Sequence, residues 1–487
     1  MSRIGIGISG IERQLLSSRA AAEAAVSLAT LRKSTGEMIN SPADNPSAFV
    51  TLSGFQSRLS KVRDVMSNVT SATSLVSQSQ SLLEQVTDQL DVIRTELLND
   101  EDHSLTPEER TEAQAKIDAA IEEINSLVGT SVDGRPVLDG SADFTVSGRD
   151  STQVARLTVH SRGNETAPTI SGQVTTAATR AALDYAGKSG QSSVQADATF
   201  TLTGTLGSRE FTVTEDQALS TVVDEVNQYS HETGVTASLD GDDLTFTSVA
   251  YGSDADIEIE ASSGTFTTTG GNDDGTANGT DAVVQINGQT YDGSTDSSGE
   301  VNPPGRISGN TFTYSENGFR FTMELEPGYT GTLDTMTVTG DALTFRLSTE
   351  AGVDSTVAIP GLQPGKLGGV SGSLDELLSG GALAGLDTNT SHAIRVVDEA
   401  LGQLAQVEGS VDGFYNSQIS TASSLMTDLE DELTDAIDSI NEVNDEEQDL
   451  IITYNSALAD NALSGLAILQ QQRLSVVSLI QQIAGLD

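Results

Sequence analysis

The sequence has no cysteine and no tryptophan, and aromatic residues make up only 4% of its 487 positions. The absence of cysteine excludes disulfides, thiol chemistry and thiolate metal sites. Basic residues are also scarce, with 24 Lys and Arg against 71 Asp and Glu, which gives a formal net charge of −47. This charge argues against nucleic acid or an anionic membrane surface as a partner, because both are polyanions.

Long apolar runs are missing as well. No stretch reaches the roughly 18 apolar residues of a membrane span. The first residues, MSRIGIGISGIERQ, have no apolar core of signal-peptide length, because Glu12 and Arg13 interrupt them. We therefore expect a protein that is either cytoplasmic or exported without a cleaved signal peptide.

The composition changes twice along the chain. Residues 1–128 and 391–487 contain little proline and repeat their apolar residues at helical spacing. Residues 140–390 are rich in Gly, Thr, Ser and Asp, and segments such as ATFTLTG alternate as half-buried strands do. The sequence thus predicts an α+β fold, with long paired N- and C-terminal helices forming a coiled-coil-like rod and β-rich domains inserted in the middle of the chain.

Apolar residues three and four positions apart predict that the rod helices from the two ends of the chain pair with each other. A helix from Leu52 to Leu98 would be about 70 Å long at ~1.5 Å per residue, which favours a rod; an ordinary helical bundle is the alternative. The residues assigned to this seam are Leu52, Phe55, Leu59, Val62, Leu90, Ile93, Leu429, Leu433 and Ile440.

The outermost segments are also amphipathic, although a single helix there has too little surface to bury by itself. We expect these segments to become ordered against other copies of the chain, so that they form a self-assembly surface. The residues assigned to it are Ile8, Leu15, Val26, Leu31, Leu466, Leu469, Val476 and Ile480.

Local signals mark where the helices begin and end. The segment RKSTGEMINSPADNPSAF at 32–49 combines glycine with two prolines, which predicts a joint between a terminal helix and the rod. The run Thr106-Pro107-Glu108-Glu109 predicts a capping box at the start of a further helix.

These boundaries predict five regions. They are terminal polymerisation helices at 1–33 and 458–487, a helical rod at 34–140 and 391–457, a connecting outer region at 141–195 and 341–390, a β-α-β module at 196–265, and a second outer β domain at 276–340.

Several segments together resemble bacterial flagellin. STGEMINSPADNPSAF is similar to the flagellin segment that follows the first terminal helix, and ALSGLAILQQQRLSVVSLIQQIAGL is similar to the last one. GSREFTV, ALSTVVDEVN and TGVTAS are similar to a β module of flagellins and other axial flagellar proteins. Pro42 and Pro46 also resemble the hook–filament junction protein of the same superfamily, which is the close alternative.

The resemblance to flagellin implies a structural protein that self-assembles into the bacterial flagellar filament used for swimming. It implies an extracellular location on the flagellum and export through the flagellar type III channel. The implied partners are other copies of the chain, an export chaperone, the filament cap and the hook-junction proteins. Many flagellins carry an arginine pair that a toll-like innate receptor reads; here only Arg94 matches, because Val92 stands at the other position.

No group of residues predicts catalysis or a cofactor. The four histidines are scattered singly, and His231-Glu232 has no second histidine at the spacing of a zinc site. The acidic loop GNDDGTANGTD at 271–281 lacks the terminal glutamate of a calcium loop. We expect no enzyme activity, metal or cofactor, and a calcium-dependent adhesin on a coiled-coil stalk is the further alternative.

Overall fold

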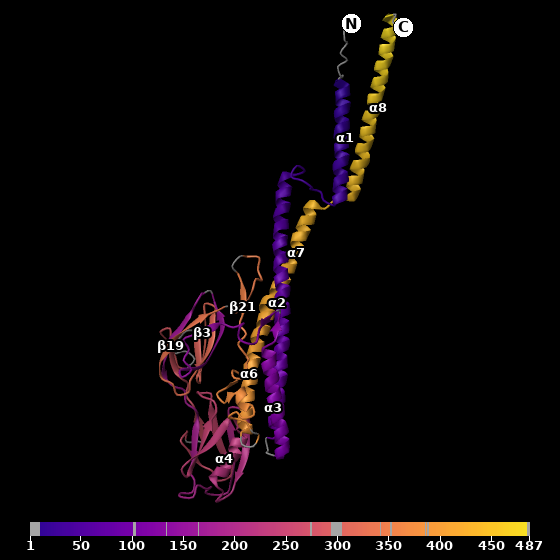
Figure 1. Ribbon diagram of the computed structural model, residues 1–487. Helices are drawn as coiled ribbons and strands as arrows, with labels where there is room; N and C mark the ends of the chain where they lie inside the picture. The colour runs from indigo at the N-terminus through magenta and orange to yellow at the C-terminus, as the bar shows by residue number, and fades with distance from the viewer. Residues whose placement is uncertain are drawn as a thin grey trace. The chain divides into compact units, whose positions relative to one another are not determined.

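The computed structural model in Figure 1 describes residues 10–100, 104–132, 134–163, 165–272, 275–293, 304–340, 342–350, 353–384, 386 and 389–484. Long helices lie at both ends of the chain and β-strands fill its middle, which confirms the predicted α+β class. The chain divides into two compact units, Met1–Ser67 with Ala422–Asp487, and Asn68–Thr421.

In the first unit, helices α1 (Gly10–Thr35) and α8 (Asp445–Ala484) lie side by side in antiparallel directions (Figure 1). Small residues form the contact, since Ala22, Ala29 and Ala462 are buried. A Cβ on Gly465 would lie 3.3 Å from Leu15 Cδ1, so the two helices approach closely there. The first part of α2 (Pro46–Leu98) and helix α7 (Ser420–Asn441) complete this unit.

The second unit contains the rest of α2 together with α3 (Pro107–Val128) and α6 (Thr390–Phe414). Each of these helices buries one apolar stripe, as the 3–4 spacing predicts. The stripes include Leu83, Leu90 and Ile93 of α2, Ile117, Ile121 and Ile124 of α3, and Ile394, Val397 and Leu404 of α6. A π-helical turn, η2 (Tyr415–Ile419), follows α6.

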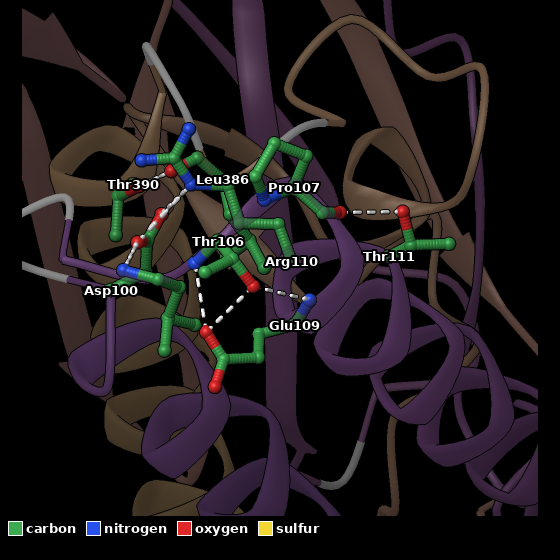
Figure 2. A network of polar contacts seen from close by, with 9 residues as sticks. Asp100, Thr106, Pro107, Glu109, Arg110, Thr111, Leu386 and Thr390 are labelled. Carbon is green, nitrogen blue, oxygen red and sulfur yellow. Dashed lines mark hydrogen bonds and ion pairs between the residues drawn. The ribbon is translucent and has the colours of Figure 1, made fainter.

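Figure 2 shows the polar contacts that begin α3. Thr106 Oγ1 accepts a hydrogen bond from the Glu109 backbone N–H at 3.3 Å, and the Thr106 backbone N–H donates to Glu109 Oε2 at 2.8 Å. The predicted capping box is therefore confirmed. The hydrogen bonds from Thr106 lower the pKa of the Glu109 carboxyl, because they favour its charged form.

We expect Thr106→Ala to lower the free energy of unfolding by about 1 kcal/mol, because it leaves a backbone N–H of the first turn without its cap. Thr111→Ala is the matched control, since the Thr111 hydroxyl donates to the Pro107 carbonyl within the helix and caps nothing. Guanidinium denaturation followed by circular dichroism would measure both. Equal losses for the two variants would contradict a capping role.

The first β region packs two four-stranded antiparallel sheets around aromatic rings. Phe200 and Phe266 stack with ring centroids 4.1 Å apart, and helix α4 (Leu219–Gln228) buries Leu219, Val222 and Val226 in the same core. A short helix, α5 (Ser230–Thr233), follows α4. The strand orders are β12-β6-β10-β9 and β13-β11-β7-β8. The strands are β6 (Ala182–Tyr185), β7 (Ala198–Gly204), β8 (Gly207–Val213), β9 (Val235–Asp240), β10 (Asp243–Ser248), β11 (Asp256–Gly264), β12 (Thr268–Thr269) and β13 (Thr276–Asn278).

The second β region joins a five-stranded sheet, β15-β14-β5-β19-β3, to a four-stranded sheet, β16-β17-β18-β4. Phe312, Phe321 and Met323 lie in the core between them. The strands are β3 (Thr145–Ser147), β4 (Val154–Arg162), β5 (Thr169–Thr176), β14 (Val283–Ile286), β15 (Gln289–Tyr291), β16 (Gly305–Ser308), β17 (Thr311–Glu316), β18 (Phe319–Leu325) and β19 (Gly331–Thr339).

Short hairpins connect the β regions to the helices. They are β1 (Ser131–Val132) with β2 (Arg135–Pro136), β20 (Leu343–Phe345) with β21 (Ser355–Val357), and β22 (Gly368–Gly369) with β23 (Gly372–Ser373), and the 3-10 turn η1 (Leu374–Leu377) follows β23. None of the described helices is long and apolar enough to cross a membrane.

The sheet pairing corrects part of the predicted domain division. Residues 141–195 do not merely connect domains, because β3, β4 and β5 are strands of the second β region and β6 belongs to the first. β12 and β13 extend the first region past the predicted limits of 196–265. The reason is that antiparallel partners lie far apart in sequence, so local alternation does not reveal them. The predicted rod is also divided between the two compact units.

Candidate self-assembly surface

The segment between α1 and α2 is a hydrogen-bonded joint. Gly36, with φ at +72°, ends α1 in the left-handed conformation that favours glycine. Asn45 begins α2, since its Oδ1 accepts from the Ala48 backbone N–H at 3.1 Å. Between them, Asp44 Oδ2 accepts from Ser41 Oγ at 3.0 Å and from the Ser41 N–H at 2.8 Å, and the hydroxyl bond lowers the pKa of Asp44. The predicted break between two helices is confirmed.

Hydrogen bonds to a residue from the C-terminal part of the chain hold this joint. The buried Asn441, the last residue of α7, accepts from the Met38 N–H through its backbone oxygen at 2.7 Å. Its side-chain Oδ1 accepts from the Ile39 N–H at 2.8 Å. The breaks between α1 and α2 and between α7 and α8 therefore meet at one residue. Sequence analysis did not single out Asn441, and its place in the short break NEVND was the only available signal.

Two ion pairs fix the alignment of α1 with α8. Near one end, Arg473 Nη1 donates to Glu12 Oε1 at 2.8 Å, and the side chain of Glu12 is only 8% exposed. Near the joint, Lys33 Nζ lies 2.5 Å from Asp449 Oδ1, and this hydrogen bond raises the pKa of Lys33. A slip of one helix along the other would separate both pairs and leave Glu12 buried without its partner.

A large set of apolar side chains on α1 and α8 stays exposed, with relative exposures of 40% to 71%. We call this set the terminal apolar surface. Its members are Ile11, Leu16, Leu31, Leu450, Tyr454, Leu463, Ile468, Leu474, Val476, Val477, Leu479 and Ile480. Exposed large apolar residues in this number make the helix pair a candidate interaction surface, because single soluble chains rarely expose large apolar areas.

The structure separates the predicted self-assembly residues into three groups. Leu31, Val476 and Ile480 belong to the terminal apolar surface, and Ile8 lies outside the described residues. Leu52, Leu59, Val62, Leu90 and Ile93 are buried within the chain, so they need no second copy to leave water. The half-buried residues are Leu15, Val26, Phe55, Leu429, Leu433, Ile440, Leu466 and Leu469.

Arg94, the predicted receptor contact, lies on α2 and forms an ion pair with Asp398 of α6, with Nε 2.6 Å from Oδ1. Two other residues of α2, which lie two heptads and one heptad before Arg94, also contact α6. Gln80 Nε2 donates to Asp412 Oδ1 at 2.5 Å, and Thr87 Oγ1 donates to Glu408 Oε1 at 3.0 Å. Arg94 therefore belongs to a polar row between two helices, and receptor recognition stays a prediction.

The histidines take part in ordinary structural contacts. His160 Nε2 lies 3.0 Å from Thr322 Oγ1, His231 Nδ1 lies 3.2 Å from Ser391 Oγ, and His392 Nε2 lies 2.6 Å from the Ser371 carbonyl oxygen. Burial lowers the pKa of both His160 and His392. In the described part of the chain, no three His, Cys, Asp or Glu residues are placed to hold a metal ion. His103 and Asp273–Asp274 of the acidic loop lie outside that part.

These features define an α+β protein in which long helices precede and follow a β-rich middle along the sequence. Residues 10–143 match the family model described as the bacterial flagellin N-terminal helical region, and residues 199–250 match the flagellin hook IN motif. The two matches confirm the resemblance found in the sequence. Over these two stretches the chain is similar to flagellins, structural proteins of the bacterial flagellum.

Solved flagellar structures show weaker likenesses. A fragment of the cap protein FliD from Escherichia coli is 18% identical over 41% of this chain and 100% of that chain, with a TM-score of 0.29. Hook-associated protein 3 from Legionella pneumophila is 14% identical over 79% and 98%, with a TM-score of 0.29. FlgL from Xanthomonas campestris is 12% identical over 79% and 99%, with a TM-score of 0.25. The similarity to flagellins rests on the two family-model matches, and no match was found among curated proteins.

Proposed function

We propose that this protein is the filament subunit of a bacterial flagellum and that it polymerises through the terminal apolar surface. The exposure of that surface is the observation that carries the proposal. Leu474 and Tyr454 are each 70% exposed, and Leu450 is 71% exposed. Complete burial of one such side chain contributes about 1.5–3 kcal/mol. Contact with neighbouring copies through several of them supplies the free energy that a stable polymer requires.

The acidic middle of the chain faces solvent in this proposal. Between Glu210 and Pro304 there is no lysine or arginine, so this part of each subunit repels its counterpart on the next one. Such a surface is suited to the outside of a polymer and unsuited to its centre. In such a polymer the apolar helices lie at the centre and the acidic β regions lie on the outside. The attractive and the repulsive parts of each subunit are thereby kept apart.

The remaining properties follow from the same proposal. The protein acts outside the cell, is exported without a cleaved signal peptide, and has no catalytic activity or cofactor. Its partners are other copies of the chain, an export chaperone, the filament cap and the hook-junction proteins. It binds neither nucleic acid nor a membrane. The hook–filament junction protein is the second candidate, favoured by Pro42 and Pro46 in the joint, where Pro46 is the first residue of α2.

Electron microscopy of the purified full chain distinguishes the two candidates. A filament subunit is expected to form long filaments by itself above a critical concentration. A junction protein occupies a limited number of positions, so it is expected to stay monomeric or to form only short assemblies. Persistent absence of filaments over a wide range of concentration and salt would overturn the filament proposal. Saturable calcium binding that orders the monomer would favour the adhesin alternative.

A further inference from the structure

Three Asn-Gly pairs occur in the chain, and all of them lie in its β-rich middle. They are Asn278-Gly279, Asn287-Gly288 and Asn317-Gly318. Asparagine is a labile residue, and a following glycine increases this lability because it has no side chain to keep its backbone nitrogen away from the asparagine amide. All three asparagines are exposed, so access of water does not distinguish them.

The backbone around Asn278 is held by buried contacts. The Gly279 N–H donates to the Ala255 carbonyl oxygen at 2.9 Å, and Gly279 is buried. A Cβ on Gly279 would lie 2.3 Å from the Thr179 carbonyl oxygen and 2.5 Å from that of Gly252, so two other backbone segments pack directly against it. Movement of the Gly279 nitrogen toward the Asn278 side chain would break both the hydrogen bond and this packing.

Asn287 lies in a two-residue turn that is held at two points. Asn287 and Gly288 connect β14 to β15, with φ at +51° and +85°, a conformation that Asn-Gly favours in hairpins. The Asn287 backbone N–H donates to the Ser171 carbonyl oxygen of β5 at 3.3 Å. The Asn287 side chain forms a hydrogen bond with the Tyr314 hydroxyl. The first bond ties the turn to the sheet, and the second restrains the side-chain amide.

Asn317 lies in a turn of the same kind that lacks these restraints. Asn317 and Gly318 connect β17 to β18, with φ at +50° and +82°, and both are exposed. Neither residue forms a hydrogen bond, through its backbone N–H or its side chain, with any residue in the described ranges. Local opening requires less free energy where fewer contacts break. Of the three pairs, Asn317-Gly318 is therefore the one that opens most readily.

We propose that Asn317 is a site of spontaneous deamidation and that the fold protects Asn278 and Asn287 from the same reaction. The Gly318 nitrogen attacks Cγ of Asn317 and forms a new N–Cγ bond. The bond from Cγ to the side-chain nitrogen breaks, and this nitrogen leaves as ammonia with the proton of the Gly318 N–H. Water then opens the succinimide ring at either carbonyl and leaves aspartate or isoaspartate.

The product changes both charge and backbone at the tip of the β17–β18 hairpin. Each event adds one negative charge to a chain whose formal charge is already −47. Isoaspartate also lengthens the backbone of a two-residue turn. The reaction takes place within one chain, so its success or failure is independent of the proposed polymerisation.

The test is incubation of the folded full chain at mildly alkaline pH, which favours attack by the glycine nitrogen, under conditions that keep the chain monomeric. Digestion at acidic pH and mass spectrometry then measure the converted fraction of each Asn-Gly pair over time. We expect conversion at Asn317 to be about tenfold or more faster than at Asn278, as the hydrogen bond and packing of Gly279 imply, and also faster than at Asn287.

The matched control is the same chain unfolded in guanidinium, which keeps the three Asn-Gly pairs and removes their contacts. We expect the three rates to become similar there. In Asn317→Asp the fastest conversion should be absent, while Asn278 and Asn287 keep their rates.

Four outcomes would overturn the proposal. Equal rates at Asn317 and Asn278 in the folded chain, or a faster rate at Asn287, would show that the observed contacts do not select the site. The same order of rates in the unfolded chain would attribute the selection to neighbouring residues. An Asn317 that reacts only in the unfolded chain would show that its turn protects it as well.

Discussion

Replacing Leu474 and Ile480 of α8 together by aspartate is expected to abolish polymerisation and to leave a folded monomer. Their side chains are 70% and 55% exposed in the single chain, so neither is needed for its folding. In the proposed polymer both are covered by neighbouring copies. The substitution removes about 1.5–3 kcal/mol of burial at each position and places two charges in an apolar contact.

The matched control replaces Gln472 and Gln481 of the same helix by aspartate. Both residues are exposed, and this variant gains the same charge without losing apolar surface. Sedimentation would measure the critical concentration, which we expect to rise at least 100-fold for the apolar double variant, as about 3 kcal/mol implies. Equal effects of the two variants would attribute the loss to charge alone. Normal filaments from Leu474→Asp with Ile480→Asp would remove this surface from the contact.

The helical part of the fold was predictable because its signals are local. Steps of three and four residues identify the buried stripe of α2, and the run from Thr106 to Glu109 fixes the start of α3 through contacts within one turn. The β regions carry the same kind of local signal for each strand but none for its partner. β4 pairs with β18, so that Val154 lies opposite Leu325, and nothing in either segment specifies the other.

The candidate surface was predictable only as a set of apolar positions. Leu52 and Val476 both belong to apolar stripes with helical spacing, yet Leu52 is 4% exposed and Val476 is 54% exposed. Periodicity identifies a face that needs covering, and only the packing of the chain shows whether the chain itself covers that face. Asn441 was missed for a related reason, since its function in the joint depends on backbone N–H groups of Met38 and Ile39 from the other end of the chain.

The ion pair between Asp100 and Arg110, near the start of α3, has the largest expected effect on stability. Asp100 is fully buried, with a side-chain exposure of 0%, and Arg110 Nε lies 3.0 Å from its Oδ2 (Figure 2). The Leu105 backbone N–H donates to Asp100 Oδ1 at 3.2 Å. Arg110→Ala leaves this carboxylate buried without the guanidinium that compensates its charge. Removal of one partner of a buried ion pair typically costs about 3–5 kcal/mol, so we expect a loss of unfolding free energy of that size.

Lys116→Ala in the same helix is the control, because the Lys116 side chain is 50% exposed in its pair with Glu96, 3.2 Å away. Exposed pairs contribute about 0–1 kcal/mol. Guanidinium denaturation of the full chain at neutral pH, under conditions that keep it monomeric, would compare the two. A second variant, Asp100→Asn with Arg110→Met, removes both charges and should recover part of the loss. If Arg110→Ala lowers the free energy of unfolding no more than Lys116→Ala does, that result would show that the ion pair of the buried Asp100 is no stronger than a surface pair. The start of α3 would then be held by its capping box and backbone contacts alone.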